Sequence, residues 1–363
     1  MMAKSGNLII LRCPLQRIPI HDFAPCSIKS GTRDGVTGTQ QDICMSLARR
    51  TSAIGGTLRY SVQVVTHIKT STDMSGFPPP LPGKAGWPWN AQPGKLPVDM
   101  KDCRAWFKIS IVTPSFNQAP FLEETIRSVL LQGYPNLEYI IIDGGSTDDS
   151  PEIIRRYEPW LTYWTSEPDD GQAGAIRRGF QQATGDILAW INSDDTYEIG
   201  ALARAADFFS DNPDMVFANG DVNLVDRDSQ FIRRVYAMRP SLFLAANSGK
   251  HGWPQQGCFW RRSTYEQVGG IDASLQFCMD KDLFIRLINA GPGRRLPGPP
   301  LANFRIHEQA KSSTLQDIAQ SETAAIIEKY GQRKWSSRRR LMGAYWWLYR
   351  KQAALRMRAG RFF

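Results

Sequence analysis

Three short clusters of polar residues carry side chains of the kind that bind metals and phosphates, and each cluster directly follows an apolar run. The clusters span residues 113–117, 143–148 and 192–195. Asp194 and Asp195, together with Asn192, offer hard oxygen ligands suited to Mg²⁺ or Mn²⁺ held jointly with substrate phosphates. Strand-end Asp and Asn residues also cap helices, and for Ser146 or Asp149 alone capping is the simpler interpretation. Capping does not account for three such clusters.

The sequence lacks the glycine-rich loops that bind phosphates through backbone N–H groups. It contains no G-x-x-x-x-G-K motif, and no G-x-G-x-x-G motif follows the first predicted strand. P-loop and dinucleotide-binding proteins are therefore disfavoured. An α/β protein that holds a diphosphate through a metal is typical of nucleotide-sugar and nucleotidyl transferases.

The elements that must position these clusters follow from the apolar pattern. Buried strands are predicted at 109–113, 139–142, 161–165 and 187–191, with helices at 121–131, 149–157 and 173–183. The predicted inward face of the first helix consists of Leu122, Ile126, Val129 and Leu130. Strands that alternate with short helices indicate an α/β fold with a doubly wound, mainly parallel central sheet and helices on both faces. Ligands bind beyond the carboxyl ends of such strands, which is where all three clusters fall.

A series of motifs runs through the middle of the chain in a characteristic order. I-S-I-V-T-P-S-F-N, E-Y-I-I-I-D-G-G-S-T-D and G-D-I-L-A-W-I-N-S-D-D come first, followed by P-Q-Q-G-C-F-W-R-R-S, V-G-G-I-D, F-C-M-D-K-D-L-F-I-R-L and F-R-I-H. In this order they resemble the family 2 glycosyltransferases, which are inverting enzymes with the GT-A fold. The resemblance covers about residues 76–310.

The resemblance implies which residues bind the nucleotide sugar. Pro114, Phe116 and Asp143 are expected to hold the base, with Asp143 accepting a hydrogen bond from a ring N–H. The full donor-binding set that it implies is Pro114, Phe116, Asn117, Asp143, Ser146, Asp148, Arg177 and Asp194.

The resemblance also implies a divalent metal cofactor, Mn²⁺ or Mg²⁺. Asp194 and Asp195 correspond to the family's metal and ribose-diphosphate motif, and Asn192 stands in for the first acid of its D-x-D pattern. His307, in F-R-I-H, matches a histidine that approaches the metal or the diphosphate in many members, although a lone histidine is also commonly structural. The implied metal ligands are Asp194, Asp195 and His307.

Asp280 matches the acidic residue that acts as general base in inverting members of the family. Asp280 and Asp282 precede apolar residues that predict a helix, whose dipole favours acids in its first turn, and this placement alone accounts for Asp282. The segment expected on the acceptor side contains Gln255, Gln256, Trp260 and Arg261. Trp253 and Trp260 suit either sugar stacking or the core, and the sequence leaves both alternatives open.

Two positions depart from the family pattern. Asp170 stands where a basic residue is often found, and Arg177 stands where an asparagine is often found. Asp170 is unfavourable beside a diphosphate, and Arg177 or Arg178 would restore the positive charge. These changes bear on donor choice or efficiency more than on the reaction class.

The net charge of the 363-residue chain, +9, is unevenly distributed. Residues 1–105 carry 13 basic and 6 acidic side chains, residues 106–332 carry 21 and 29, and residues 333–363 carry 10 and none. An acidic central segment between two basic terminal segments is not typical of a nucleic-acid-binding domain, so no nucleic acid is expected. The basic tail has Leu and aromatic residues at helical spacing, which favours an interfacial helix on an anionic membrane surface. The alternatives for this tail are a helix packed on the catalytic domain with solvated arginines and, less favoured, contact with nucleic acid.

Four segments are predicted along the chain. Residues 1–74 are a poorly ordered N-terminal extension or sequence upstream of a later start, 75–105 a proline-rich arm, 106–312 the GT-A domain and 313–363 a helical basic segment. The six cysteines form no C-x-x-C pair, which argues against a disulfide framework and fits a reducing compartment. No apolar run suits a signal peptide or a spanning helix. A cytoplasmic protein, peripheral on the inner face of the cytoplasmic membrane, is therefore expected.

Taken together, these features predict a metal-dependent, inverting glycosyltransferase. It would move a sugar from a nucleoside-diphosphate sugar to a hydroxyl of a glycan or lipid-linked acceptor in surface polysaccharide, lipopolysaccharide or other cell-envelope glycan biosynthesis. Asp280 would remove the acceptor proton while the metal offsets charge on the departing diphosphate. The alternatives are a nucleotidyltransferase, which releases pyrophosphate, and a catalytically silent binding protein recruited to the membrane.

Overall fold

The structure is a computed structural model that describes residues 50–51, 59–60 and 73–331, apart from 93, 102–103, 248–251, 309 and 312–314. The chain divides into two units, Met1–Val64 and Val65–Phe363. The described part of the first unit is one antiparallel pair, β1 (Arg50–Thr51) with β2 (Arg59–Tyr60). Most of the predicted N-terminal extension, residues 1–74, and the whole basic tail, residues 333–363, lie outside the described residues.

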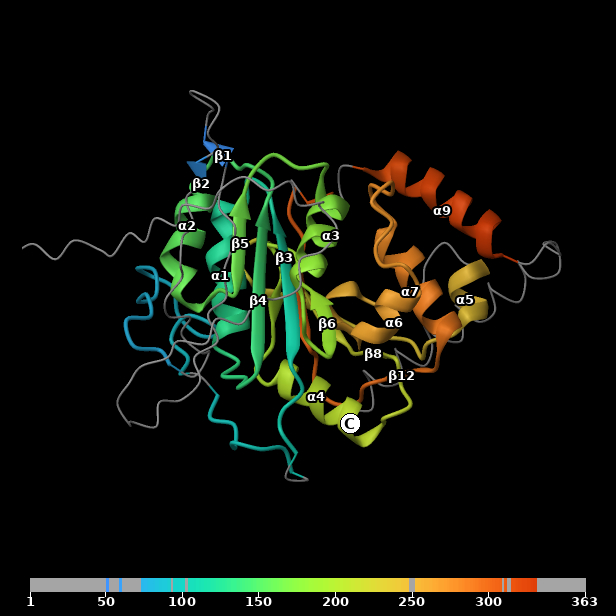
Figure 1. Cartoon of the computed structure of the whole chain (residues 1–363), viewed down its shortest axis with the longest axis horizontal. Coiled ribbons are helices and arrows are strands. Elements are labelled where there is room, and N and C mark those ends of the chain that lie inside the picture. The colour runs from blue at the N-terminus through green and yellow to red at the C-terminus, as the bar shows by residue number, and fades with distance from the viewer. Residues whose placement is uncertain are drawn as a thin grey trace, which may run out of the picture. The chain divides into compact units, whose positions relative to one another are not determined.

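A seven-stranded sheet forms the centre of the second unit (Figure 1). In spatial order its strands are β12 (Gly293–Arg295), β8 (Phe217–Asn219), β11 (Cys258–Arg261), β6 (Ile187–Trp190), β3 (Ile109–Ser115), β4 (Leu137–Asp143) and β5 (Tyr163–Ser166). Strand β11 is antiparallel to both of its neighbours, and the other pairs are parallel. The predicted α/β class with a mainly parallel sheet is confirmed.

Helices cover both faces of this sheet. They are α1 (Ala119–Leu130), α2 (Ser150–Tyr157), α3 (Gln172–Gln182), α4 (Ala201–Asp211), α5 (Leu242–Asn247), α6 (Arg262–Gln267), α7 (Met279–Ala290) and α9 (Gln316–Tyr330), with 3₁₀ turns η1 (Glu158–Trp160) and η2 (Gln255–Gly257). Helices α1, α2 and α4 pack on one face, and α3, α6 and α7 on the other, where α5 and α9 join them (Figure 1). None of the described helices has the length and apolarity that crossing a bilayer requires.

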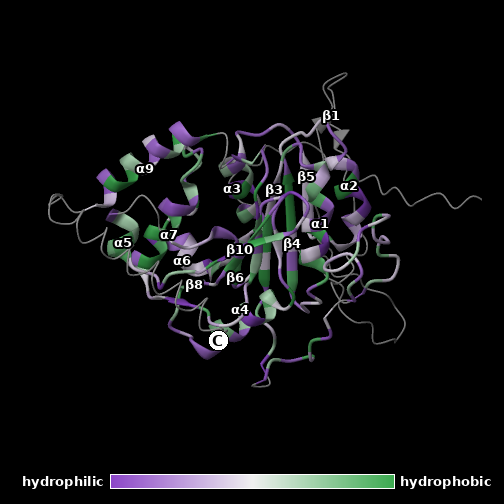
Figure 2. Ribbon diagram, turned by 180° about the vertical axis from the view of Figure 1, so that it is seen from behind, coloured by the Kyte–Doolittle hydropathy of each residue, from purple (hydrophilic) through white to green (hydrophobic). Residues whose placement is uncertain are grey.

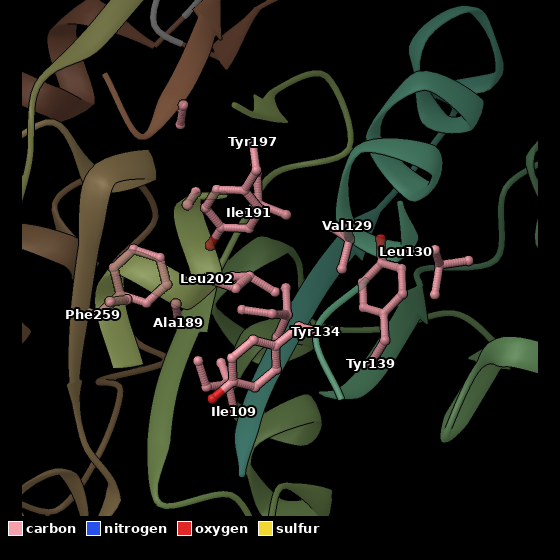
Figure 3. Packing of buried hydrophobic residues seen from close by; sticks show 14 of the residues in the cluster. Ile109, Val129, Leu130, Tyr134, Tyr139, Ala189, Ile191, Tyr197, Leu202 and Phe259 are labelled. Carbon is pink, nitrogen blue, oxygen red and sulfur yellow. The ribbon is translucent and has the colours of Figure 1, made fainter. Parts of the chain in front are cut away.

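The central strands are buried on both faces, which explains their continuous apolar runs. In β4, Tyr139 and Ile141 pack with α1, whereas Ile140 and Ile142 pack with α3, because successive strand side chains point to opposite faces. Hydrophobic residues accordingly gather along the central strands (Figure 2), and Figure 3 shows part of the cluster beneath α1. All four residues predicted for the inward face of α1 are fully buried.

A second, four-stranded sheet brings distant segments to the carboxyl end of the first. Its order is β10 (Phe231–Val235), β9 (Val222–Val225), β13 (Ala302–Arg305) and β7 (Thr196–Tyr197). Strand β7 begins directly after the 192–195 cluster and pairs antiparallel with β13. Residues just beyond β13 therefore lie beside those just before β7.

The proline-rich arm packs on α1 and on the segment around Tyr197, although its described residues form no helix or strand. Arg127 of α1, 3% exposed, donates hydrogen bonds to the backbone carbonyls of Pro78, Pro88 and Trp89. The indole Nε1 of Trp87 donates to the carbonyl of Tyr197. One buried cation thus binds several separate points of the arm.

Candidate active site

The polar clusters meet at the carboxyl-terminal edge of β3, β4 and β6, which we call the donor edge. Hydrogen bonds join the loops after β3 and β4: the N–H of Asn117 donates to Oγ of Ser146 (2.7 Å), and Oδ1 of Asn117 accepts from the N–H of Thr147 (2.9 Å). Asn117 has a φ of +52°, which Asn tolerates better than most residues. The two loops form one surface, on which Phe116 is 60% exposed.

Asp148 holds the first turns of two helices. Its Oδ2 accepts from the N–H of Ala119 in α1 (2.9 Å), and its Oδ1 accepts from the N–H of Ser150 in α2 (3.0 Å). Burial raises the pKa of Asp148, but these hydrogen bonds outweigh burial and lower the pKa below its ordinary value. Both carboxylate oxygens are engaged within the protein.

Asp143 is fully buried at the end of β4. Its carboxylate accepts from the N–H and Oγ of Ser146 (2.9 and 2.6 Å) and from Oγ of Ser166 (2.7 Å). An ionised carboxylate has about four acceptor positions, so a ring N–H would take the fourth or displace a serine hydroxyl. The loop after β5 packs tightly against the loop after β4. Gly145, in the loop after β4, has a φ of +80°, and a Cβ there would lie 2.9 Å from the backbone nitrogen of Pro168.

Asp195 is 1% exposed and binds three N–H donors. Its Oδ1 accepts from the backbone N–H of Arg305 (2.9 Å), and its Oδ2 accepts from the side-chain amides of Gln256 (2.8 Å) and Asn192 (3.1 Å). Burial raises the pKa of Asp195 well above its ordinary value and the charge of Asp194 adds to the rise, while the N–H donors oppose it. This carboxylate joins three segments of the site.

Asp194 and His307 form a contact between a carboxylate and an imidazole. Oδ2 of Asp194 lies 3.0 Å from Nε2 of His307, and the Asp194 side chain is 18% exposed. His307 follows β13 by two residues, and its ring packs on Phe121 with the ring centroids 4.6 Å apart. The pairing of β13 with β7 brings these residues together.

Arg305 is buried behind this pair. Its Nε donates to the carbonyl of Asp194 (2.8 Å), and its Nη2 forms an ion pair with Glu124 of α1 (3.1 Å). Its Nη1 donates to the carbonyl of Arg227 (2.9 Å) and to Oγ of Ser229 (2.8 Å), both between β9 and β10. The guanidinium therefore fixes three segments around the donor edge.

The side chains at this edge partly fit a divalent metal. Asp194 and His307 offer a carboxylate oxygen and an imidazole nitrogen, both of which Mn²⁺ accepts, whereas both oxygens of Asp195 receive hydrogen bonds. In the part of the chain that the structure describes, no three His, Cys, Asp or Glu side chains are grouped closely enough to hold a metal. An ion at Asp194 would need further ligands from substrate phosphates and water.

Asp280 lies half-buried in the first turn of α7. Burial raises the pKa of the Cys258 thiol, and the charge of Asp280 adds to that rise. Burial lowers the pKa of Lys281 and of Lys311, and Asp280 partly offsets both shifts. The Asp280 carboxylate is thus close enough to these three groups to act on their titration.

Lys311 and Gln172 connect the surroundings of Asp280 to the 192–195 loop. Nζ of Lys311 donates to Oε1 of Gln172 (2.8 Å), and Nε2 of Gln172 donates to Oδ1 of Asn192 (2.8 Å). Sequence reasoning missed both residues. The sequence signals for them were weak: Lys311 follows His307 by four residues, and Gln172 directly precedes the predicted helix 173–183.

Two of the predicted acceptor-side residues lie away from the donor edge. Trp260 is fully buried within the aromatic core, and Arg261 pairs with Ile187 at the opposite end of β6. The acceptor-side prediction does not fit the structure for these two residues, because β11 runs antiparallel and carries them into the core and to the far edge. Gln255 and Gln256, in η2, do lie at the donor edge.

The residues that depart from the family pattern lie at the surface. Asp170 and Arg177 are exposed, and Arg177 acts electrostatically on Tyr265 of α6. Arg178 lies 3.7 Å from Glu167. By contrast, the cation of Lys311 is hydrogen-bonded to Gln172, which in turn donates to Asn192.

Comparison with known proteins identifies relatives of this chain. Residues 110–267 match the profile described as Glycosyl transferase family 2. An uncharacterised glycosyltransferase of Mycobacterium tuberculosis is 32% identical over 182 residues, which cover 49% of this chain and 68% of that protein. The putative teichuronic acid biosynthesis glycosyltransferase TuaG of Bacillus subtilis is 33% identical over 105 residues, 28% of this chain and 41% of TuaG.

A solved structure has a similar fold. The crystal structure of S. aureus TarS 1-349 in complex with UDP-GlcNAc aligns with a TM-score of 0.51 at 15% identity, covering 62% of this chain and 68% of that one. The layered α/β architecture and these matches define a glycosyltransferase of the GT-A type. The chain belongs to glycosyltransferase family 2, which confirms the resemblance seen in its motifs.

Proposed function

We propose that this enzyme transfers a sugar from a nucleoside-diphosphate sugar to a hydroxyl group, with inversion at the anomeric carbon. The observation that carries the proposal is that Gln172 joins Lys311 to Asn192, in the loop that also carries Asp194. Asp194 contacts His307, and Asp280 lies within electrostatic reach of Lys311. Asp194 with His307 suits binding of the diphosphate. Asp280 suits deprotonation of the acceptor hydroxyl, and Lys311 suits compensation of the negative charge on the departing diphosphate.

Each side chain then has a defined task. Asp280 accepts the proton of the attacking hydroxyl as that oxygen bonds to the anomeric carbon and the bond to the diphosphate breaks. Lys311 offers positive charge to the departing diphosphate. When bound at Asp194 and His307, a divalent ion would supply further charge compensation. One displacement inverts the centre, so no covalent nucleophile is needed.

The nucleoside is proposed to lie on the joined loops after β3 and β4. The exposed ring of Phe116 suits stacking on a base, and Asp143 suits acceptance of a ring N–H, with Pro114, Asn117 and Ser146 shaping the surface. Because both Asp195 oxygens receive hydrogen bonds, we assign Asp195 to positioning the 192–195 loop instead of binding the metal. The same reasoning assigns Asp148 to the helix ends.

The acceptor is proposed to be a cell-envelope glycan or its lipid-linked precursor, at the inner face of the cytoplasmic membrane. The similarity to TuaG, a putative teichuronic acid biosynthesis glycosyltransferase, supports an envelope glycan. The ten basic and no acidic residues of 333–363 support contact with anionic lipid.

A donor panel tests the proposal. The full chain is incubated with UDP-, GDP- and dTDP-sugars, with and without Mn²⁺, and the released nucleotide is identified. We expect release of a nucleoside diphosphate from at least one donor, and its loss in Asp194→Ala. Pyrophosphate release from a nucleoside triphosphate would identify a nucleotidyltransferase instead. Nucleotide binding without turnover, unchanged in Asp280→Asn, would identify a binding protein.

A further inference from the structure

One carboxylate of α9 binds the loop that leads into α7. The side chain of Glu322 accepts hydrogen bonds from three consecutive backbone N–H groups, those of Gln276 (2.6 Å), Phe277 (2.9 Å) and Cys278 (2.7 Å). Cys278 is the N-cap residue of α7, and no local side chain caps that helix. A residue 44 to 46 positions further along the chain therefore holds the start of α7.

Further contacts join α9 to the first turns of α7. Asp282, 1% exposed, accepts from Nζ of Lys329 (3.1 Å) and from the hydroxyl of Tyr330 (2.7 Å), so its role is structural, as its helix position alone indicated. Sγ of Cys278 lies 3.4 Å from Oγ1 of Thr323. Helix α9 is thus bound to α7 on both sides of Asp280.

The charge of Glu322 also reaches the polar network of the donor edge. It partly offsets the lowering of the Lys311 pKa by burial, as Asp280 does. Lys311 therefore lies within electrostatic reach of both carboxylates.

From this geometry we propose that Glu322 is a positioning residue that sets the orientation of the general base Asp280. This inference rests on the proposed function. Three N–H groups that converge on one carboxylate fix the backbone of 276–278, because each additional bond removes an alternative loop conformation. Asp280 follows that segment by two residues, so its carboxylate direction depends on it. A general base works only when it is within hydrogen-bond reach of the hydroxyl it deprotonates.

The test compares Glu322→Gln with Glu328→Gln, which makes the same charge change at an exposed position of α9. We expect Glu322→Gln to lower kcat by about ten- to a hundredfold, because misplacing a reacting group by about 1 Å costs up to that much. The donor KM should change by less than about twofold, and Glu328→Gln should resemble the unaltered enzyme.

A double-substitution experiment separates positioning from a general loss of structure. In an Asp280→Asn background, Glu322→Gln should lower kcat by less than about twofold, since the group it positions is already missing. The inference would be overturned if the double substitution lowered kcat by the product of the two single factors. It would also be overturned if Glu322→Gln alone left kcat unchanged.

Amide hydrogen exchange gives a readout that does not need turnover. Glu322→Gln should accelerate exchange at 276–278 and in the first turn of α7, with the strands unchanged. Unaltered exchange there would overturn the inference even if activity changed. If no donor supports turnover by the unaltered enzyme while exchange responds as expected, the proposed function fails but Glu322 still holds the start of α7.

Discussion

Nε2 of His307 and Oδ2 of Asp194 lie 3.0 Å apart although 113 residues separate them in the chain. The contact depends on β13 pairing with β7, a strand of two residues. Arg305 secures the same junction, because its guanidinium binds the carbonyl of Asp194 and its N–H binds the carboxylate of Asp195. The donor edge is therefore held by short strands and buried polar contacts.

Asp194→Asn should weaken donor turnover while keeping the contact with His307. The amide retains the shape of the carboxylate but lacks its charge, so affinity for a divalent ion and its diphosphate should fall. We expect kcat/KM to drop by about a hundredfold or more at fixed Mn²⁺, measured as nucleoside diphosphate release. Asp170→Asn, at an exposed carboxylate nearby in the sequence, is the matched control and should lose little.

Asp280→Asn should lower kcat by about 10²- to 10⁴-fold, the range typical of lost general-base catalysis. Donor affinity should remain within about twofold, as measured by calorimetry with the nucleoside diphosphate. A variant that binds the donor less tightly but turns over normally at saturation would show that Asp280 serves binding and not proton transfer.

Lys311→Met should weaken donor binding by about tenfold, the effect of losing one charge-assisted hydrogen bond. Burial lowers the pKa of Lys311 from its ordinary 10.5, so the ammonium loses its proton at a lower pH than an exposed lysine does. Donor affinity of the unaltered enzyme should therefore decline on the alkaline side before pH reaches about 10.5, and the Met variant should lack this decline. Lys101→Met, at a side chain 89% exposed, should keep it.

Arg305→Met should destabilise the protein by about 3–5 kcal/mol, because it leaves Glu124 buried without its cation and removes the donors to three segments. The loss is measured as a lower urea midpoint. Arg178→Met removes a cation from a longer, partly exposed contact at 3.7 Å and should cost about 1 kcal/mol or less. Equal losses in both variants would contradict the importance assigned to Arg305.

Acid should weaken the fold through Glu138, at the end of the sheet opposite the active site. Burial raises the pKa of Glu138, but hydrogen bonds from Lys108, Ser110 and Thr184 outweigh it and lower the pKa below the ordinary 4.5. The unfolded chain therefore binds this proton at higher pH, so the stabilisation is complete above about 4.5 and disappears as pH falls through the folded pKa.

Urea unfolding of Glu138→Gln across this pH range checks the sign. The difference in unfolding free energy between the unaltered protein and Glu138→Gln should shrink on acidification. A difference that grows as pH falls would contradict the assignment. Glu152→Gln, at a side chain 65% exposed, should show little pH-dependent difference.

The strands β3, β4 and β6 at the centre of the sheet were predictable because they are buried on both faces, whereas β8, β11 and β12 were not predicted. Largely apolar runs such as 109–113 and 139–142 have few other stable arrangements, and the structure extends them to Ile109–Ser115 and Leu137–Asp143. The donor-edge clusters followed from the rule that parallel strands end on the same side.

What could not be predicted depends on pairing between distant, short or antiparallel elements. Trp260 and Arg261 belong to a motif, but the motif does not say that β11 runs antiparallel. The choice between stacking and core therefore stayed open for Trp260, and the far-edge position of Arg261 was missed. Lys311 and Glu322 act through partners far away in the chain, and no local pattern marks such contacts.

The contact between Arg127 and the proline-rich arm changes what counts as an independently folding part of this chain. Residues 110–267 are recognised as the family, yet Arg127 within them is 3% exposed and uses the carbonyls of Pro78, Pro88 and Trp89 as acceptors. A fragment cut at residue 110 would keep the guanidinium and lose those acceptors. A fragment that keeps these three hydrogen bonds must therefore begin at or before Pro78, well upstream of the segment that matches the family.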